Sequence, residues 1–382
     1  MLLFFTTILF LLFWSYFIYP VFLKFLYYIG IRRNVFFIDN FELPSVTLVI
    51  VAHNEENVIK ERLENALKLN YPTSKLQIIV ASDFSTDKTN EIVKSYSSEG
   101  VFLYKTKERK GKANAHNEVC EIINSEIIAF SDANSLWETD ALHNLVLNFK
   151  DQNVGYVTGK LEYVNTNENG TSNSEGLYWR YELWLRRLES DVLSITAGNG
   201  AIYAIRREVY EPINILYNHD FEFPSLVKKK GLYSIYDNTA IAKEKAGETS
   251  DDEYKRKVRM LGRTWHKIIN DFSIFNPFKV GLLYSLFMFS HRLIRYSTGL
   301  LQLIIFITNF FILEMGTIFQ VFIVLQTFFY LFSILGAYYK RNRIIYFMYY
   351  FNLFQFATLV GFTKALLNNV KPFWESPQTT RN

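Results

Sequence analysis

The sequence has almost no cysteine, no repeated or low-complexity stretch and little net charge, and each absence narrows what the protein can be. Cys120 is the single cysteine among 382 residues, so an internal disulfide is excluded and a reducing compartment is expected. The net charge is only +4, and the basic residues cluster beside apolar runs rather than along one polar helix. A nucleic-acid groove is therefore not expected, whereas contact with anionic membrane lipids is.

The N-terminus lacks both parts of a cleavable signal, namely an early basic region and a small-residue cleavage site. Its apolar run is longer than the roughly 20 residues that a bilayer crossing needs. We therefore expect residues 1–33 to form a retained transmembrane anchor. Lys24, Arg32 and Arg33 lie toward its C-terminal side, so the positive-inside rule places the following segment in the cytoplasm.

Residues 276–370 hold three further apolar segments, near 293–313, 316–338 and 344–366. Each of them approaches the length of a membrane span. The third has basic residues at both ends, which fits either a transmembrane helix or a helix along the inner membrane surface. These segments lack the paired acidic residues of a transporter, so a transport function is not favoured.

Between these apolar regions, residues 44–275 have the composition of a soluble domain. Short β-branched runs at 46–52, 76–82, 101–106 and 126–134 alternate with segments of helical spacing. This alternation predicts right-handed crossovers and a mostly parallel sheet flanked by helices. In the first helical segment, the expected inward positions are Val58, Leu63 and Leu67.

Polar side chains come directly after three of the predicted strands, in the stretches HNEE, SDFSTD and SDANS. The oxygen-bearing residues in these stretches are Asn54, Glu55, Asp83, Asp87, Asp132 and Asn134. Because ligands bind outside the carboxyl ends of parallel strands, these side chains can line one site for a cation or a phosphate-bearing ligand. The alternatives are an ordinary turn at Asp132 and helix caps at Asp83 and Asp87.

Four motifs follow one another along the chain, namely VTLVIVAHNEE, IVASDFSTDKT, RKGKANAHN and IIAFSDANS. In that order and spacing they resemble the nucleotide-sugar half of glycosyltransferase family 2, and TAGNGAIYAIRRE and NHDFEFPSLVKKKG resemble the acceptor half of membrane-bound members. The resemblance implies an α/β domain of the GT-A fold, with N-terminal and C-terminal transmembrane helices. The expected division is an anchor at 1–33, a cytoplasmic GT-A domain at 44–275, interfacial and transmembrane helices at 276–370 and a tail at 371–382.

The resemblance assigns a divalent cation to the end of the fourth strand. Asp132 and Asn134 occupy the two ends of the family's D-x-D motif, where Mg²⁺ or Mn²⁺ bridges a nucleotide diphosphate. Such cations need hard oxygen ligands and take few of them from protein. Asn134 stands where the usual motif has a second aspartate, which puts its direct coordination in question and weakens the expected metal affinity.

Further residues of the donor site also follow from the resemblance. Asp83 matches the aspartate that accepts a hydrogen bond from the base, and its acceptor-only carboxylate favours uracil or thymine. Asn54 and Glu55 would lie beside the base and ribose, and Phe84 replaces a usual glycine. Lys112 would meet the phosphates; a solvated basic loop is the alternative.

For the acceptor, Asp220 matches the catalytic aspartate of the family's E-D motif, which takes a proton from the attacking hydroxyl. His219 replaces the usual acidic neighbour and is expected to support Asp220; the alternatives are a general base and a metal ligand. The resemblance also places Gly198 and Asn199 at the bound substrate.

Two residues outside these motifs are expected to contact substrate. Arg259 is the residue that remains of the Q-x-x-R-W motif of processive members, and its planar fork can hold a diphosphate. Because the glutamine and tryptophan are missing, transfer is better supported than polymerisation. Trp179 lies in a run of aromatic and basic residues, where it would stack on a sugar or anchor a helix at the membrane surface.

Together these observations predict an inverting glycosyltransferase of cell-surface glycan synthesis in the inner (cytoplasmic) membrane. It would move a hexosyl or N-acetylhexosaminyl group from a nucleotide sugar, with UDP favoured, to a lipid-linked or polysaccharide acceptor. Membrane lipids are expected partners and nucleic acid is not, while a homodimer and polysaccharide-export proteins stay open. The alternative is a membrane sensor that binds sugar nucleotides without turnover, which Asn134 and the altered Q-x-x-R-W motif would fit.

Overall fold

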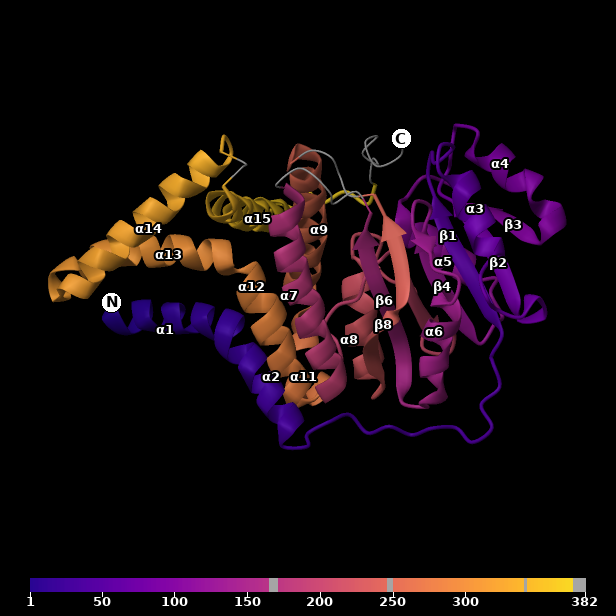
Figure 1. Cartoon of the computed structure of the whole chain (residues 1–382), viewed down its shortest axis with the longest axis horizontal. Coiled ribbons are helices and arrows are strands. Elements are labelled where there is room, and N and C mark those ends of the chain that lie inside the picture. Colours follow the sequence, from indigo (N-terminus) through magenta and orange to yellow (C-terminus); the bar gives the residue numbers. More distant parts are fainter. Residues whose placement is uncertain (165–170, 246–249, 340–341, 374–382) are drawn as a thin grey trace. The chain divides into compact units, whose positions relative to one another are not determined.

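The computed structural model describes residues 1–164, 171–245, 250–339 and 342–373, which belong to two compact units (Figure 1). The helical unit comprises Met1–Ile31, Thr166–Leu188 and Thr249–Val370. The sheet unit comprises Arg32–Asn165, Glu189–Glu248 and Lys371–Asn382. Of the expected tail, residues 374–382 lie outside the part of the chain that the structure describes.

The sheet unit is built on a mixed sheet of 8 strands in the order β3-β2-β1-β4-β7-β6-β8-β5. The strands are β1 (Val46–Ala52), β2 (Leu76–Ser82), β3 (Val101–Lys105), β4 (Ile127–Asp132), β5 (Leu136–Trp137), β6 (Val154–Tyr163), β7 (Ile202–Arg206) and β8 (Tyr233–Glu244). The first four are parallel neighbours, whereas β7 runs antiparallel to both β4 and β6. The expected α/β class is confirmed, and the parallel arrangement holds for the half of the sheet that carries the donor motifs.

Helices cover the sheet because its strands are apolar on both faces. They are α3 (Ile59–Leu67), α4 (Thr89–Ser95), α5 (Lys112–Cys120), α6 (Ala141–Leu147) and α8 (His219–Lys229). Every residue of β1 is buried, as is typical of a parallel strand covered on both sides. Apolar side chains of α5 and α8 pack with Val49, Val51, Ile128 and Phe130 in one core.

The buried stripe of α3 differs from the predicted one. Leu63 is buried as expected, but Val58 and Leu67 are only half-buried. The other buried positions of α3 are Ile59, Arg62 and Ala66. The helix begins at Ile59 and follows a spacing of three and four residues from there, so the inward face is rotated by one position and includes an arginine.

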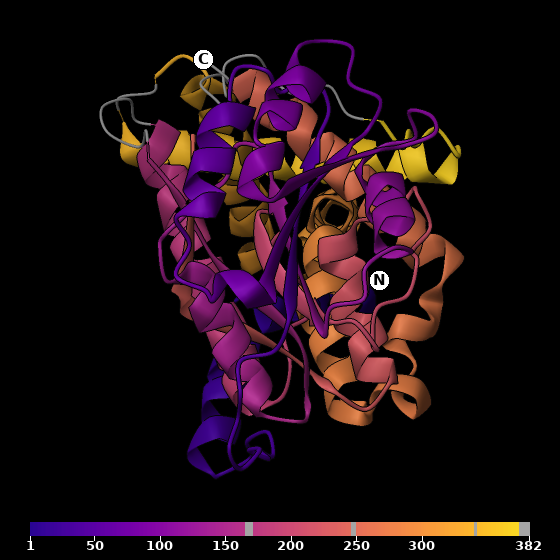
Figure 2. The ribbon, with the colours of Figure 1, turned by 90° about the vertical axis from the view of Figure 1, so that its right-hand side faces the viewer.

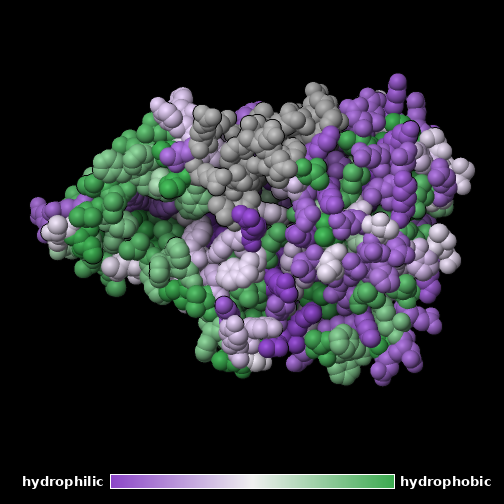
Figure 3. Space-filling view, viewed as in Figure 1, coloured by the Kyte–Doolittle hydropathy of each residue, from purple (hydrophilic) through white to green (hydrophobic). Residues whose placement is uncertain are grey.

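The helical unit contains three helical stretches that are long and apolar enough to cross a membrane, within the described residues: Leu2–Tyr28, Thr317–Gly336 and Ile344–Leu366. The N-terminal stretch consists of α1 (Leu2–Phe13), a π-helical turn (Trp14–Ile18) and α2 (Tyr19–Tyr28). The others are α14 (Thr317–Gly336) and most of α15 (Arg343–Leu366). Apolar side chains gather over α1, α13 (Thr298–Phe310) and α14 (Figure 3).

The expected span near 293–313 is not one straight helix. The stretch Leu282–Tyr296 and α13 are bent by 64° at a short break. The first of these stretches contains α11 (Leu282–Phe287), a π-helical turn (Met288–Leu293) and α12 (Ile294–Tyr296). By length and composition, the pair fits one broken span or a re-entrant segment. The number of apolar residues in the sequence did not show this bend.

Figure 2 shows the same ribbon turned by 90°, with α15 in yellow. Glycines let α15 pack closely against its neighbours within the helical unit. A Cβ on Gly361 would lie 2.8 Å from the backbone nitrogen of Gly262, on α9 (Ser250–Asn270). A Cβ on Gly299 would lie 2.7 Å from the carbonyl oxygen of Gln355. Small residues allow such backbone approaches in membrane helix pairs, so these contacts position α15 against α9 and α13.

Candidate active site

The carboxyl end of β4 meets the start of α5 in the sheet unit. Lys112 is the first residue of α5, and its ammonium group contacts the carboxylate of Asp132. The same group donates a hydrogen bond to the carbonyl oxygen of Gly200 (3.2 Å). An expected phosphate ligand and an expected metal ligand therefore lie side by side at one strand end. Gly200 joins them as a residue that the motifs did not single out.

Asp83 lies in the loop after β2 and is 1% exposed. Its carboxylate accepts hydrogen bonds from the backbone nitrogens of Lys110 (3.2 Å) and Gly111 (3.0 Å). Burial raises its pKa above the ordinary value, and these two amide hydrogen bonds oppose the rise in part. Asp83 thus holds the loop that leads into Lys112, and the base contact assigned to it stays a prediction.

Gly111 needs to be glycine in this loop. Its φ is +89°, and a Cβ there would overlap the carbonyl oxygen of Pro372. The guanidinium of Arg109 also lies 5.5 Å from the ring centre of Phe373. The first residues of the expected tail therefore rest on the loop that Asp83 holds.

The HNEE motif and the SDFSTDKT stretch are joined by hydrogen bonds from backbone nitrogens to side-chain oxygens. Asn54 adopts a φ of 54° and accepts a hydrogen bond from the backbone nitrogen of Thr86 (2.8 Å). The backbone nitrogen of Glu55 donates to the hydroxyl of Thr89 (2.8 Å). Asp87 accepts hydrogen bonds from the backbone nitrogens of Glu56 and Thr89, which is a local turn contact before α4, whose N-cap is Lys88.

On the acceptor side, Asp220 and Gly198 are brought together. The backbone nitrogen of Gly198 donates to the carbonyl oxygen of Asp220 (2.7 Å), at the start of α8. A Cβ on Gly198 would overlap the hydroxyl of Tyr156 on β6, so the loop approaches β6 closely. The backbone nitrogen of Asn199 donates to the hydroxyl of Thr158 (3.0 Å). The 198–200 loop therefore links Asp220 to Lys112 through Gly200.

Three rings pack together next to this loop, with Tyr203 stacked on His219 and His116 edge-on to both. His116 and His219 lie 4.7 Å apart between ring centres, and Tyr203 lies 5.5 Å from His219. Burial, with Lys112 nearby, lowers the pKa of His116 well below its ordinary value, so its ring is neutral at pH 7. His219 is buried among these rings, and its expected support of Asp220 stays a prediction. His116 and Tyr203 were not predicted, because nothing local marks them as neighbours.

Asp132 and Asn134 fit a small divalent cation by their chemistry. Both side chains are half-buried at the end of β4 and present one carboxylate and one amide oxygen. In the described part of the chain, no group of three or more His, Cys, Asp or Glu residues could hold a metal ion. Mg²⁺ and Mn²⁺ do not require such a group, because a bound diphosphate and water complete their shell.

Trp179 and Arg259 belong to the helical unit. Trp179 lies on α7 (Thr171–Val192), with the Arg186 guanidinium 5.8 Å from its ring centre. Arg259 lies on α9 and is half-buried. Their assignments to substrate stay predictions. The aromatic and basic run of α7 also contains a buried acid that the motif reading missed: Glu182 forms ion pairs with Arg292 and Arg295, both at 3.2 Å.

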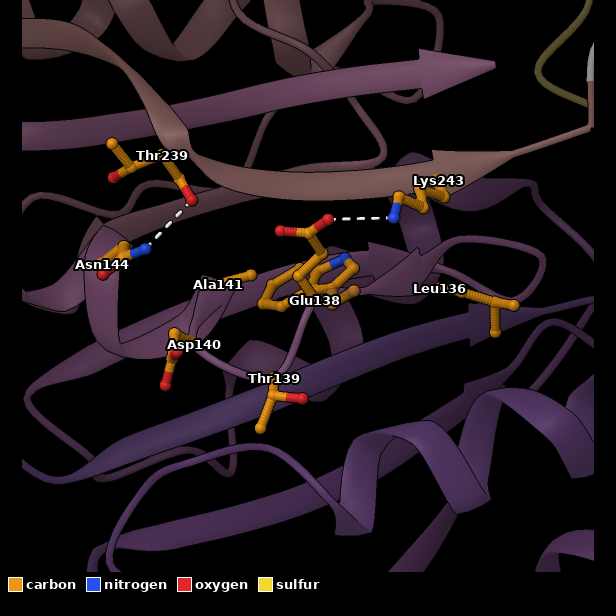
Figure 4. Close-up of a pocket in the computed structure, with 9 residues that line it drawn as sticks. Leu136, Glu138, Thr139, Asp140, Ala141, Asn144, Thr239 and Lys243 are labelled. Atoms are coloured by element: carbon orange, nitrogen blue, oxygen red, sulfur yellow. Dashed lines mark hydrogen bonds and ion pairs between the residues drawn. The ribbon is translucent and has the colours of Figure 1, made fainter. Parts of the chain in front are cut away.

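A cavity of about 480 Å³ opens beside β5 and β8 (Figure 4). Its lining includes an ion pair between Glu138 and Lys243 (2.9 Å), and Asn144 donates a hydrogen bond to the carbonyl oxygen of Thr239 (2.9 Å). None of the expected site residues lines it. The cavity is therefore not the site that the motifs indicate.

Comparisons with known proteins agree with this architecture. Residues 47–213 match the family model described as Glycosyl transferase family 2. The chain is 27% identical to "Probable glycosyltransferase YdaM" of Bacillus subtilis over 320 residues, which cover 78% of this chain and 76% of that protein. It is 28% identical over 173 residues to "Beta-monoglucosyldiacylglycerol synthase" of Nostoc, and 32% over 120 residues to "Poly-beta-1,6-N-acetyl-D-glucosamine synthase" of Staphylococcus aureus.

The last two matches cover 44% and 31% of this chain, and only 37% and 29% of those proteins. Among solved structures, the chain resembles the mannosyltransferase PcManGT from Pyrobaculum calidifontis in complex with GDP-Man and Mn²⁺. The TM-score is 0.69 at 20% identity, over 93% of this chain and 96% of that one. This similarity shows that the fold of the chain is GT-A-like.

Proposed function

We propose that this chain, a glycosyltransferase whose family 2 domain spans residues 47–213, moves a sugar from a nucleotide donor to a lipid-linked or polysaccharide acceptor at the inner membrane. One observation carries the proposal. Asp83, Lys112, Asp132 and Asp220 belong to one connected set of contacts through the 110–111 and 198–200 loops. These contacts join residues from four stretches of the chain, and they support the proposal that the four residues serve one site.

The proposed chemistry assigns one task to each group. The Asp220 carboxylate takes the proton from the acceptor hydroxyl as that oxygen attacks the anomeric carbon. A single displacement from the face opposite the leaving group inverts the configuration there. Lys112 stabilises the charge that develops on the departing diphosphate, and Arg259 is proposed to hold the same group. Asp132 and Asn134 would hold Mg²⁺ or Mn²⁺, which when bound neutralises part of that charge.

The named relatives support the class of acceptor. Two of them are named as synthases of a glycolipid and of a β-1,6-linked N-acetylglucosamine polymer, so both products are compatible with this domain. The donor is proposed to be UDP-linked, because the acceptor-only carboxylate of Asp83 suits the imide N–H of uracil. The cytoplasmic placement of the sheet unit rests on the basic residues after the N-terminal apolar stretch.

The test is sugar transfer by the purified full chain with a panel of UDP- and GDP-sugars and Mn²⁺. Asp220→Asn is expected to lower the rate by about 10²- to 10⁴-fold, the usual size of a general-base contribution. Asp132→Ala should abolish metal-dependent transfer while the protein still unfolds cooperatively. Glu138→Gln, which changes an exposed acid a few residues beyond Asp132, serves as the control and should keep full activity.

Full activity in either site variant would remove that residue's assignment. Binding of UDP without nucleotide release, across lipid-linked and polysaccharide acceptors, would instead favour the sensor that the altered motifs also fit.

A further inference from the structure

Arg62 is an arginine buried without an acidic partner. It lies on α3 and is 0% exposed. Its Nε donates to the hydroxyl of Ser131 (3.1 Å), and its Nη1 donates to the side-chain oxygen of Asn65 (2.8 Å). The guanidinium carbon lies 5.3 Å from the ring centre of Trp137. Its Nη2 has no hydrogen-bond partner within the described residues.

Burying this charge is costly, and the contacts offset only part of the cost. A guanidinium removed from water needs a paired acid or a full set of hydrogen bonds. No carboxylate in the described ranges forms an ion pair with Arg62, and burial alone lowers its pKa to about 9. At neutral pH the group is still charged. An apolar side chain of the same volume would stabilise the core at least as well, so the charge itself calls for a purpose.

The position of Arg62 indicates what its charge is for. Ser131, its hydrogen-bond partner, directly precedes Asp132 on β4. Because successive side chains on a strand point to opposite faces, Arg62 approaches the end of β4 from one face of the sheet. Lys112 contacts Asp132 from the other face. Two cations therefore flank the strand end where the donor diphosphate is proposed to bind.

We infer that Arg62 is a positioning residue for the donor, whose buried charge behind Ser131 attracts the diphosphate of a nucleotide sugar held at the end of β4. This inference rests on the proposed function, because it requires a diphosphate at that place. Asn134 supports this inference. Because it replaces the second acid of the motif, Asp132 is the single carboxylate there whose negative charge offsets the positive charge of Arg62. Over a separation of about 10 Å between the guanidinium and the diphosphate, one opposite charge inside a protein changes the affinity for the diphosphate by about tenfold or more.

The experiment compares the binding of UDP and of uridine to the full chain with Mn²⁺, by calorimetry and by competition. Arg62→Met fills a similar volume without charge, so the affinity for UDP should fall about tenfold or more while that for uridine stays the same. Arg62→Lys keeps the charge and should retain most of the UDP affinity. A residue that serves only packing would not separate a charged ligand from its neutral nucleoside.

Arg206→Met is the matched control. Arg206 also stacks on an aromatic ring, with its guanidinium carbon 5.3 Å from the ring centre of Phe149. It pairs with Ile127, at the opposite end of β4 from Asp132. We expect Arg206→Met to lower stability and leave the UDP-to-uridine ratio unchanged.

Two results would overturn the inference. One is an equal loss of UDP and uridine affinity in Arg62→Met, and the other is the same UDP-to-uridine ratio in Arg62→Met as in Arg206→Met. If Arg62→Met does not fold, Arg62→Gln compared with Arg62→Lys gives the same contrast. A wild-type chain that binds neither UDP nor GDP refutes the proposed function itself; if it binds GDP, GDP and guanosine replace the uracil pair.

Discussion

Phe84 occupies a backbone position that glycine would fill more easily. Its φ of 57° is in the left-handed region, and its side chain is 53% exposed. A left-handed non-glycine residue costs roughly 1–2 kcal/mol, and an exposed ring recovers little of this by packing. We therefore expect Phe84→Gly to raise the free energy of unfolding by about 0.5–1 kcal/mol, after the entropy lost by glycine.

Denaturant unfolding of the purified chain measures this change. Phe102→Gly is the matched control, because Phe102 is 56% exposed and lies within strand β3. There glycine should lower stability by about 1 kcal/mol. If Phe84→Gly and Phe102→Gly change the free energy of unfolding in the same direction, the backbone conformation of Phe84 does not explain its effect.

The buried carboxyl of Asp83 should leave a signature in the pH dependence of stability. Burial raises its folded pKa above the ordinary 3.8, so between the unfolded and folded values the native state binds more protons. Stability contributed by this group is therefore present at low pH and falls as pH rises through that window. The unfolding free energy of the wild type minus that of Asp83→Asn should therefore fall as pH rises from near 3.8. A difference that is flat or grows with pH would contradict the raised pKa.

At the scale of elements, the crossing of α9 and α15 can be tested with two glycines. A Cβ on Gly361 would approach the nitrogen of Gly262 to 2.8 Å, whereas a Cβ on Gly262 meets nothing closer than 3.7 Å. Gly361→Ala should therefore destabilise the helix pair by about 1–3 kcal/mol through overpacking. Gly262→Ala should be neutral or stabilise by up to about 1 kcal/mol, because alanine is the better helix former.

Thermal unfolding in detergent compares the two variants directly. Equal melting temperatures would mean that the helices do not cross at these residues. The comparison is sharp because both substitutions add one methyl group to a helix interior, so only the tertiary contact differs.

At the scale of the whole molecule, the membrane topology is the open prediction. By the positive-inside rule we expect the basic residues after the N-terminal apolar stretch and those near the start of α15 to lie in the cytoplasm, so the short connection before α14 should face outside. In a Cys120→Ala background, Met315→Cys should react with an impermeant maleimide in intact cells, and Asp39→Cys should react only after lysis. Met315 and Asp39 are both exposed, and the native Cys120 is buried. The opposite labelling pattern would reverse the proposed orientation.

The sequence by itself determined the local features of this protein. The bounds of β1 and β2 agree with the predicted runs, because β1 is buried along its whole length and β2 over its last five residues, so both are mainly apolar in sequence. The strand ends predicted that Asp83 and Asp132 lie at one edge of the sheet, whereas the place of Lys112 followed from the resemblance.

Tertiary structure alone decided the features that depend on distant partners. The antiparallel direction of β7, the bend between Leu282–Tyr296 and α13, and the burial of Arg62 against Ser131 all arise from segments far apart along the chain. Periodicity reports which face of an element is apolar, but it carries no information about what covers that face. Arg62 received no role from the sequence, and only its packing against β4 showed where its charge lies.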